Sequence, residues 1–386
     1  MERRKNPNDK FGFIDLMKIK DFIDYEQPNE YIVESDRYSS KYSTPVLTAG
    51  QSFILGYTNE SKGIYKKGPC IIFDDFTTSV HYVDFPFKVK SSAMKILTAK
   101  NNADLKYCYY LLLSLSNMPP NHKRQWISTT SEKNHLLPSI DNQISIVKQL
   151  DLISDTIANY TNQIEKLDEL VKARFIELFG TVRENPYKYP TATLKEVCHK
   201  ITDGKHGGCE QEENSGYYYI GAREIYDGEI HYDTAPQIKY TDFSKDYRRC
   251  NIEQGDMVIV NTGATIGKSA IASSSLTERT LLQKSVALIK VKPNIISAEF
   301  LRYCYMANPS MYMVESASAQ PNLLLSKINT TVIYLPPMDL QLQFADFVQQ
   351  VDKSKFNSLI PHKYDKYHQL MLVVSLLYIF IQSYLM

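Results

Sequence analysis

The sequence predicts a mixed α/β (α+β) protein with two tandem halves that are joined by long antiparallel coiled-coil helices. Three observations predict this fold: a segment that occurs twice, short β-type runs before each copy, and a sustained heptad pattern after the first copy. The chain has 386 residues, enough for two ordinary domains. Hydrophobic residues make up 43% of it and charged residues 23%, as is typical of a folded protein.

The repeated segment reads LPSIDNQISIVKQL from Leu137 and LPPMDLQLQFADFV from Leu335, an offset of 198 residues. Its Leu, Pro, Asp and Gln recur at matching places, and its apolar positions match as well. A second pair, LKYCYY from Leu105 and LRYCYM from Leu301, has an offset of 196 residues. Because two independent segments share nearly one offset, we interpret the chain as two tandem copies of one unit.

Each half starts with short β-type runs that are separated by turns. These runs include PVLTAG, SFILGYT and CIIFDDF in the first half, and YYYIGARE, DMVIVNTG and SVALIKV in the second. A short helix is predicted to close each region, at 105–114 and at 299–306. A Leu-Pro step then leads into the repeated segment, where we expect Asp141 and Asp339 to be the N-caps of two helices.

The helix after Asp141 has the clearest pattern in the chain. Apolar or aromatic residues recur at alternating spacings of three and four, with one arginine among them, and neither Gly nor Pro interrupts the run before Gly180. Such a seam over about four heptads favours coiled-coil packing, and the helix beginning at Asp339 is the expected antiparallel partner. A long core helix within one domain is the alternative. The seam consists of Leu150, Ile153, Ile157, Tyr160, Ile164, Leu167, Val171, Arg174 and Leu178.

The second helix should mirror the first, but the repeat stops near Lys355. Pro361 follows, and the last segment, LMLVVSLLYIFIQSYLM, is almost wholly apolar. Three interpretations of this tail remain open: an end replaced by a frameshift or recombination, a divergent helix that packs on the first helix, or a membrane anchor. The predicted segments are a first α/β domain (1–136), a central helix (137–180), a second α/β domain (181–334), a second helix (335–356) and an atypical tail (357–386).

The charge and cysteine content restrict the possible functions. Lysine and arginine number 44 against 43 acidic residues, so any contact with nucleic acid must come from local patches or from partner subunits. The start of the chain lacks the apolar region of a signal peptide, and the six cysteines include no C-x-x-C pair, which favours free thiols in a reducing cytoplasm. The spacing of Cys198, His199, His206 and Cys209 fits none of the usual zinc-finger patterns.

The arrangement resembles the specificity subunits of type I restriction-modification systems over roughly residues 12–355. The segments that carry this resemblance are the paired LPSIDNQ and LPPMDLQ motifs, the central helix ending in ARFIELFG, and the series ITDGKHG, GDMVIVNTGATIG and QKSVALI. The resemblance implies that each α/β region is a target-recognition domain for double-stranded DNA, and that the two helices form a spacer. It also implies docking to two methyltransferase subunits and to restriction (motor-nuclease) subunits, in the cytoplasm and away from any membrane.

Two recognition domains of different sequence are expected to read a bipartite, asymmetric DNA target. Base readout needs side chains that donate or accept hydrogen bonds at groove edges, with cations on the phosphates. Residues of these types lie beside the ends of the β-type runs, although each could instead be an ordinary solvated residue or a turn hydroxyl. The candidates are Thr77, Thr78, Lys88, Lys90, Ser91 and Ser92 in the first half, and Lys205, His206, Arg223, Thr262, Thr265, Lys268, Gln283 and Lys284 in the second.

No motif in the sequence predicts catalysis by this chain. GATIGKS, from Gly263, has one residue too few between its glycines for a phosphate-binding loop. Asp74 and Asp75 could ligate Mg²⁺ in a stand-alone nuclease, but strand-end carboxylates in a turn are the simpler interpretation. We therefore expect a non-catalytic subunit with no cofactor of its own, in a complex that uses S-adenosylmethionine, ATP and Mg²⁺ through its partners. The alternative is a coiled-coil scaffold without a DNA-reading role.

Overall fold

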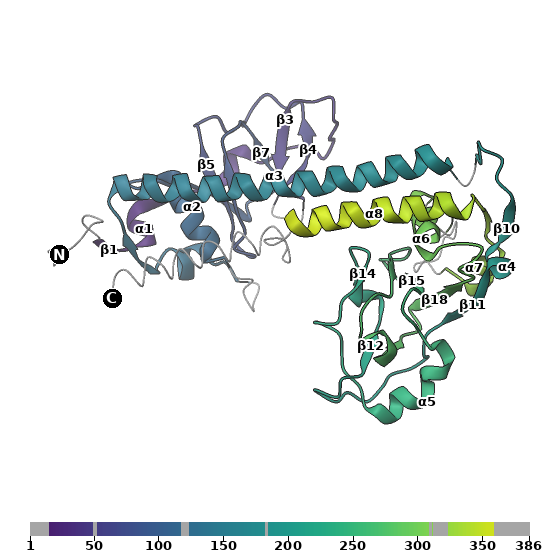
Figure 1. Cartoon of the computed structure of the whole chain (residues 1–386). Helices are drawn as coiled ribbons and strands as arrows, with labels where there is room; N and C mark the ends of the chain where they lie inside the picture. Colours follow the sequence, from purple (N-terminus) through teal and green to yellow (C-terminus); the bar gives the residue numbers. More distant parts are fainter. Residues whose placement is uncertain are drawn as a thin grey trace. The chain divides into compact units, whose positions relative to one another are not determined.

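The computed structural model describes residues 15–48, 52–116, 123–181, 184–308, 311 and 323–358. These residues form two compact units, the first up to Thr161 and the second from Asn162 to Ser358. One continuous helix, α3 (Ile140–Phe179), ends the first unit and begins the second (Figure 1). The predicted tail 357–386 lies outside the described residues from 359 onwards, so its three interpretations stay open.

The first unit is built on a four-stranded antiparallel sheet. Strand β5 lies inside this sheet, and all five of its residues are buried. One side of the sheet packs on helix α2 and on the start of α3, where Leu150 is 3% exposed. The sheet order is β2 (Ile23–Glu26), β8 (Met94–Ala99), β5 (Cys70–Asp74) and β6 (Val80–Val83).

Smaller elements complete the first unit. A second sheet has the order β4 (Ile54–Thr58), β3 (Thr44–Leu47) and β7 (Lys88–Val89), and a separate ladder joins β1 (Asp15–Lys18) to β9 (Asn134–Leu137). The helical pieces are α1 (Ile19–Phe22), η1 (Pro28–Tyr31), α2 (Leu105–Ser114) and η2 (Trp126–Thr130).

The second unit repeats this plan. Its four-stranded antiparallel sheet has the order β11 (Cys198–Asp203), β18 (Val286–Val291), β15 (Met257–Val260) and β16 (Ser269–Ile271). Its two-stranded ladders are β10 (Thr191–Thr193) with β19 (Val332–Tyr334), β12 (Tyr218–Ile220) with β17 (Thr280–Leu282), and β13 (Ile225–Tyr226) with β14 (Glu229–Ile230). Its helical pieces are α4 (Leu194–Val197), η3 (Ala222–Glu224), α5 (Tyr240–Cys250), η4 (Thr277–Arg279), α6 (Ala298–Ala307), α7 (Leu325–Thr330) and α8 (Met338–Ser358).

The two main sheets have the same strand order when β2, β8, β5 and β6 are matched with β11, β18, β15 and β16. A short helix also precedes the first strand of each sheet, and a helix follows the strand that lies second in each order. The mixed helix-and-sheet fold predicted from the sequence is therefore confirmed, and each unit carries one copy of the same motif. The short helices predicted at 105–114 and 299–306 are α2 and α6.

The predicted N-cap role of Asp141 and Asp339 is wrong. Helices α3 and α8 begin at Ile140 and Met338, so each aspartate is the second helical residue. The Leu-Pro step starts the helix earlier than expected, and the backbone N–H of Gln143 already donates to the Ser139 carbonyl at 2.9 Å. A carboxylate in the first turn still interacts favourably with the positive end of the helix dipole.

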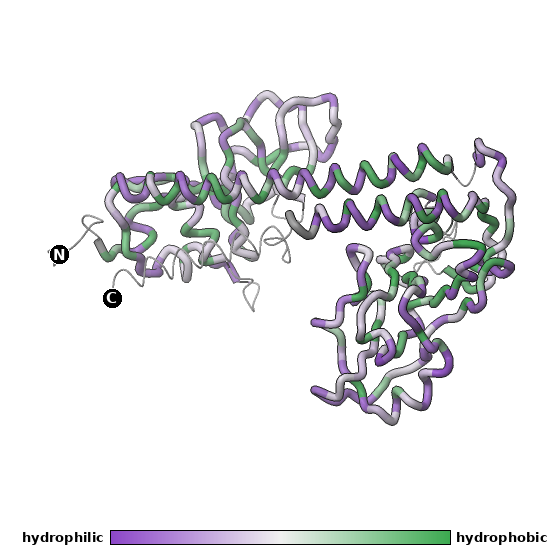
Figure 2. The backbone as a smooth tube through the Cα atoms, in the orientation of Figure 1, coloured by the Kyte–Doolittle hydropathy of each residue, from purple (hydrophilic) through white to green (hydrophobic). Residues whose placement is uncertain are grey.

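Within the second unit, the C-terminal part of α3 packs against α8 in antiparallel. The ring centroids of Phe175, near the end of α3, and Phe344, near the start of α8, are 5.4 Å apart, whereas Lys355, late in α8, pairs with Asp168 of α3 at 2.6 Å. Figure 2 shows hydrophobic and hydrophilic residues alternating along both segments, as expected for helices with one buried side. All nine residues of the predicted seam in α3 are buried or half-buried, and Phe175 and Phe179, outside that seam, are fully buried.

The cysteines are free thiols, and all except Cys209 are buried. Burial raises the pKa of the Cys250 thiol to about 11, so this side chain is an unreactive core residue at neutral pH. No helix within the described ranges is both long enough and apolar enough to span a bilayer.

Candidate nucleic-acid interface

One end of the main sheet of the second unit gathers six of the eight DNA-contacting candidates predicted in the second half. Strands β11 and β15 end there, and β18 and β16 begin there, because neighbouring strands in this sheet are antiparallel. Residues that follow β11 or β15, or that precede β18 or β16, must therefore lie at this same end of the sheet. This "polar edge" consists of Lys205, His206, Thr262, Lys268, Gln283 and Lys284.

Backbone hydrogen bonds join two loops of the polar edge directly. The N–H of Lys205 donates to the Leu282 carbonyl at 2.7 Å, and the N–H of Lys284 donates to the Lys205 carbonyl at 2.9 Å. Gly204 makes this approach possible, because a Cβ atom there would lie only 2.2 Å from the carbonyl oxygen of Leu282. The loop that carries Lys205 and His206 is therefore fixed against the loop that carries Lys284.

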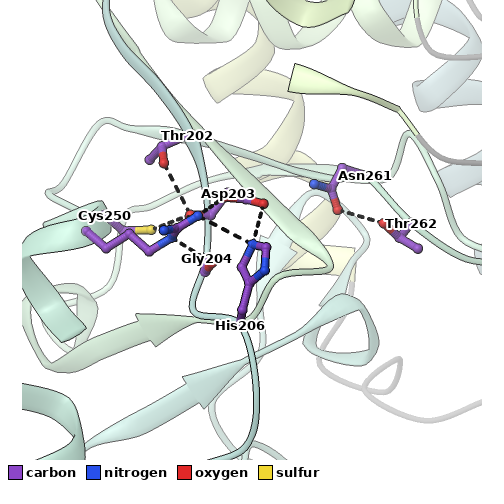
Figure 3. A network of polar contacts seen from close by, with 8 residues as sticks. Thr202, Asp203, Gly204, His206, Cys250, Asn261 and Thr262 are labelled. Atoms are coloured by element: carbon purple, nitrogen blue, oxygen red, sulfur yellow. Dashed lines mark hydrogen bonds and ion pairs between the residues drawn. The ribbon is translucent and has the colours of Figure 1, made fainter. Parts of the chain in front are cut away.

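Asp203, the last residue of β11, organises the side chains of this loop (Figure 3). One carboxylate oxygen lies 2.9 Å from Nε2 of His206, and the other accepts a hydrogen bond from Arg249. The Nε of Arg249 also donates to the carbonyls of Asp203 and Gly204, each at 3.0 Å. Burial alone would raise the pKa of Asp203, but the hydrogen bonds from His206 and Arg249 outweigh burial and lower it, so the carboxylate is charged at neutral pH.

Gln283 is held beside the same loop. Its backbone N–H donates to the Ile220 carbonyl at 2.8 Å, and its side-chain amide donates to the Tyr219 carbonyl at 3.4 Å. A Cβ atom on Gly221 would lie 2.5 Å from Oε1 of Gln283, so a glycine is required there for this side chain to lie across the backbone. Arg223 follows on η3 and is exposed.

The turn between β15 and β16 supplies the remaining candidates of the second unit. It leads from strand to strand, so GATIGKS has no helix after it and is not a phosphate-binding loop. Thr262 donates its hydroxyl to Oδ1 of Asn261 at 3.2 Å, and the N–H of Lys268 closes the turn on the Thr265 carbonyl at 3.2 Å. Among the described residues, the amino groups of Lys268 and Lys284 have no ion-pair partner, and both side chains are exposed. They are therefore available to bind phosphates.

The equivalent edge of the first unit carries Thr77, Thr78, Ser91 and Ser92. The first two lie in the turn from β5 to β6, and the serines precede β8. Thr77 and Ser92 are half-buried and Ser91 is exposed. Thr78 is only 7% exposed and adopts φ of 59°, and its carbonyl accepts a 2.7 Å hydrogen bond from Ser116. Burial of its side chain excludes Thr78 from direct contact with DNA, because the turn folds inward at this residue.

The two candidate lysines at β7, Lys88 in the strand and Lys90 directly after it, differ in exposure. Lys88 is 2% exposed and pairs with Glu60 at 2.7 Å, while it also donates to the Lys62 carbonyl at 2.8 Å. Its prediction as a DNA contact is therefore wrong, because this ammonium group is already neutralised inside the unit. Lys90 forms an ion pair with Asp36 at the surface and stays half-exposed, so phosphate could replace that carboxylate.

The two acidic residues considered for a nuclease have structural roles. Oδ1 of Asp74 accepts hydrogen bonds from the N–H groups of Phe76 and Thr77, at 2.8 and 3.3 Å, and so caps the turn. Asp75 pairs with the fully buried Lys95 at 2.9 Å and also accepts from the N–H of Trp126 at 2.8 Å. In the part of the chain that the structure describes, no group of three or more His, Cys, Asp or Glu side chains is placed to hold a metal ion.

The sequence-based prediction missed Asp203 and Arg249, although it included His206. Arg249 lies in the last turn of α5, 46 residues from the aspartate that it contacts, and the two are brought together only by tertiary folding. The one local signal was the Arg248-Arg249 pair at a helix end, which is a common feature of helix C-termini for other reasons.

Comparisons with known proteins agree with this architecture. Residues 186–363 match the family model of the type I restriction modification DNA specificity domain. The chain is 45% identical over 164 residues to the type I restriction enzyme EcoR124I/EcoR124II specificity subunit of Escherichia coli, and the match covers 39% of this chain and 41% of that protein. Thus the matched part spans less than half the length of this relative.

A solved structure extends the comparison to the whole fold. The S subunit of a type I restriction-modification system from M. genitalium matches with a TM-score of 0.58 at 16% sequence identity, over 98% of each chain. At that identity the match establishes the fold alone. The match to the type I restriction modification DNA specificity domain thus holds for residues 186–363, and the solved S subunit agrees with the fold of the chain.

Proposed function

We propose that this chain is the DNA sequence-specificity subunit of a type I restriction-modification complex, and that it recognises a bipartite, asymmetric double-stranded DNA target. One observation carries the proposal: both units have the same sheet order, with candidate DNA-contacting side chains at the same edge of each sheet. Because the side chains at the two edges differ, the two units are expected to read different half-sites.

The proposed contacts combine base readout with phosphate binding. In the second unit, His206, Gln283 and Thr262 offer hydrogen-bonding groups, and Lys268 and Lys284 supply exposed positive charge. In the first unit, Thr77, Ser91 and Ser92 offer hydroxyl groups with Lys90 nearby in sequence. Lys90 is the one half-exposed lysine among the first-half candidates and is paired with Asp36, so partner subunits are expected to supply further phosphate contacts there.

The chain is proposed to be non-catalytic and to work in the cytoplasm. Asp74 caps a turn and Asp75 forms an ion pair with Lys95, which supports a structural role for both. Methylation and cleavage would then belong to two methyltransferase subunits and to restriction subunits, with S-adenosylmethionine, ATP and Mg²⁺ bound by those partners. The proposed domains keep the limits 1–136 and 181–334, with α3 and α8 as the connecting helices.

The test is co-purification of the full chain with the methyltransferase subunit encoded beside it, followed by methylation sequencing of host DNA with and without this gene. We expect a bipartite, asymmetric methylated motif that is lost when the gene is deleted. Capture of the methyltransferase without any such motif would contradict the proposal and favour a scaffold role.

A further inference from the structure

His206 is held in one orientation by two neighbours of opposite charge. Its Nε2 lies 2.9 Å from Oδ2 of Asp203 and 3.4 Å from Nη2 of Arg249, and the Asp203 side chain is itself only 13% exposed. The ring comes from the loop after β11 (Figure 3). Arg249 reaches the same carboxylate from α5. More than half of the His206 side chain, 54%, remains exposed to solvent.

This geometry determines which ring nitrogen carries the proton. A charged carboxylate can only accept hydrogen bonds, so the nitrogen that faces Asp203, Nε2, carries a proton. Arg249 cannot accept the hydrogen bond from this N–H, because guanidinium groups only donate. In the neutral ring Nδ1 is therefore the acceptor, and it has no hydrogen-bond partner among the residues that the structure describes.

We propose that His206 reads an amine-bearing base, adenine or cytosine, through Nδ1 in the major groove. This inference rests on the proposed function. In the major groove, adenine offers N6–H₂ and cytosine offers N4–H₂ as donors, whereas guanine and thymine offer the acceptors O6 and O4 at the corresponding positions. An acceptor fixed by Asp203 therefore favours adenine and cytosine. Guanine and thymine would instead place an acceptor oxygen opposite the lone pair of Nδ1.

Neighbouring groups of the polar edge fit this role. Lys205 beside it is neutralised by Asp246 at 2.5 Å, so the nearest lysine does not compete as a donor for the same base. Lys284, whose N–H is bound to the Lys205 carbonyl, is exposed and placed to hold a phosphate. Gly207, with φ of 90°, follows His206 and has open space around the position of a Cβ, so DNA could approach the ring closely.

The test uses the complete methyltransferase complex that contains this chain, after methylation sequencing has given the wild-type motif. Binding is then measured on duplexes substituted at each position of the motif. His206→Ala should reduce discrimination at one adenine or cytosine position by about tenfold, with the other half-site unchanged. His199→Ala is the matched control, because His199 is an exposed histidine of β11, the strand before the loop of His206, and its side chain has no hydrogen bond or ion pair with the residues that the structure describes.

Asp203→Asn gives a sharper outcome. Arg249 should continue to donate to the amide oxygen, which turns the amide NH₂ toward Nε2 of His206. Nε2 then becomes the acceptor and the proton moves to Nδ1, so the preferred base at that position should change to guanine or thymine. Unchanged discrimination at every position in both variants would overturn the inference. Absence of any motif for the wild-type complex would instead overturn the proposed function, and this inference with it.

Discussion

The side chain of Gln143 accepts a 2.8 Å hydrogen bond from the backbone N–H of Asp104, the residue that caps helix α2. Its amide nitrogen donates to the Pro138 carbonyl at 2.8 Å, at the start of its own helix. Gln341 repeats both contacts, with the N–H of Ser297, the cap of α6, at 2.9 Å and with the Pro336 carbonyl at 2.9 Å. The Leu-Pro-x-x-x-x-Gln repeat is therefore a clamp that joins the end of each α/β region to the helix that follows it.

Loss of this clamp should destabilise the unit that contains it. Gln143 and Gln341 are both fully buried, so replacement of either by Ala leaves a part-buried N–H and a buried carbonyl without partners. We expect each substitution to lower the free energy of unfolding by about 2–4 kcal/mol, as measured by urea denaturation. Gln163→Ala, on an exposed position of α3, is the control and should change stability by less than about 0.5 kcal/mol. Equal effects of the three substitutions would contradict the clamp.

The same clamp shows how far the sequence predicts the structure. The repeat itself, the helix α3 and the α/β class followed from local patterns that need no knowledge of tertiary contacts. The chemical reason for the glutamine did not, because its partner Asp104 lies 39 residues away. The caps also show that the similar LKYCYY and LRYCYM segments differ in their position within the helix by about one turn. Helix α2 begins at Leu105, whereas Leu301 is the fourth residue of α6.

The polar edge was predicted in part for a related reason. Polar residues beside apolar strand runs could be found in the sequence, and antiparallel pairing brought them to one edge. Burial of a side chain could not be predicted from these local patterns, so Lys88 and Thr78 were counted among the DNA-contacting candidates although tertiary contacts bury both. Asp203 and Arg249 were missed because an acid at a strand end and an arginine at a helix end have no local signal for their contact.

Acid should destabilise the first unit through His135. Burial lowers the pKa of His135 to about 4, and its Nε2 lies 2.7 Å from the hydroxyl of Tyr107. The unfolded chain binds a proton near the ordinary pKa of about 6.5, whereas the folded unit does so only near 4. Stability is therefore fully present above pH 6.5 and falls as the pH drops toward 4, by an amount on the order of 3 kcal/mol for this group.

His135→Asn should reduce the difference in urea unfolding free energy between pH 7 and pH 4.5, because the substituted side chain does not titrate. Burial also lowers the pKa of His81, so some of the pH dependence should remain in this variant. The control is His199→Asn, at an exposed position, which should keep the wild-type pH dependence. An identical loss of stability in His135→Asn and the wild type would show that His135 does not carry the effect.

The pairing of α3 with α8 should depend on a cluster of aromatic rings. Phe344 is fully buried, and its ring centroid lies 5.4 Å from that of Phe175 and 5.5 Å from that of Phe179. Phe344→Ala leaves a cavity between the helices and should cost about 3–5 kcal/mol in unfolding free energy. Leu342→Ala is the matched control on the same helix, because Leu342 is 50% exposed and should lose much less. Comparable losses in both variants would exclude a buried core at this position.

The exposed lysines of the polar edge should determine the salt dependence of DNA binding. Lys268 and Lys284 are exposed and have no ion-pair partner in the part of the chain that the structure describes, and each phosphate contact releases condensed counterions from the duplex. In the complex with the methyltransferase, Lys284→Ala should weaken binding to matched and mismatched duplexes alike and reduce the slope of log K against log salt by about 1. Lys268→Ala should act in the same way, and the double variant should reduce the slope by about 2. Lys195→Ala, an exposed lysine on α4, is the control for a general loss of positive charge. A slope that stays at the wild-type value in the double variant, with folding intact, would place the phosphate contacts on another surface.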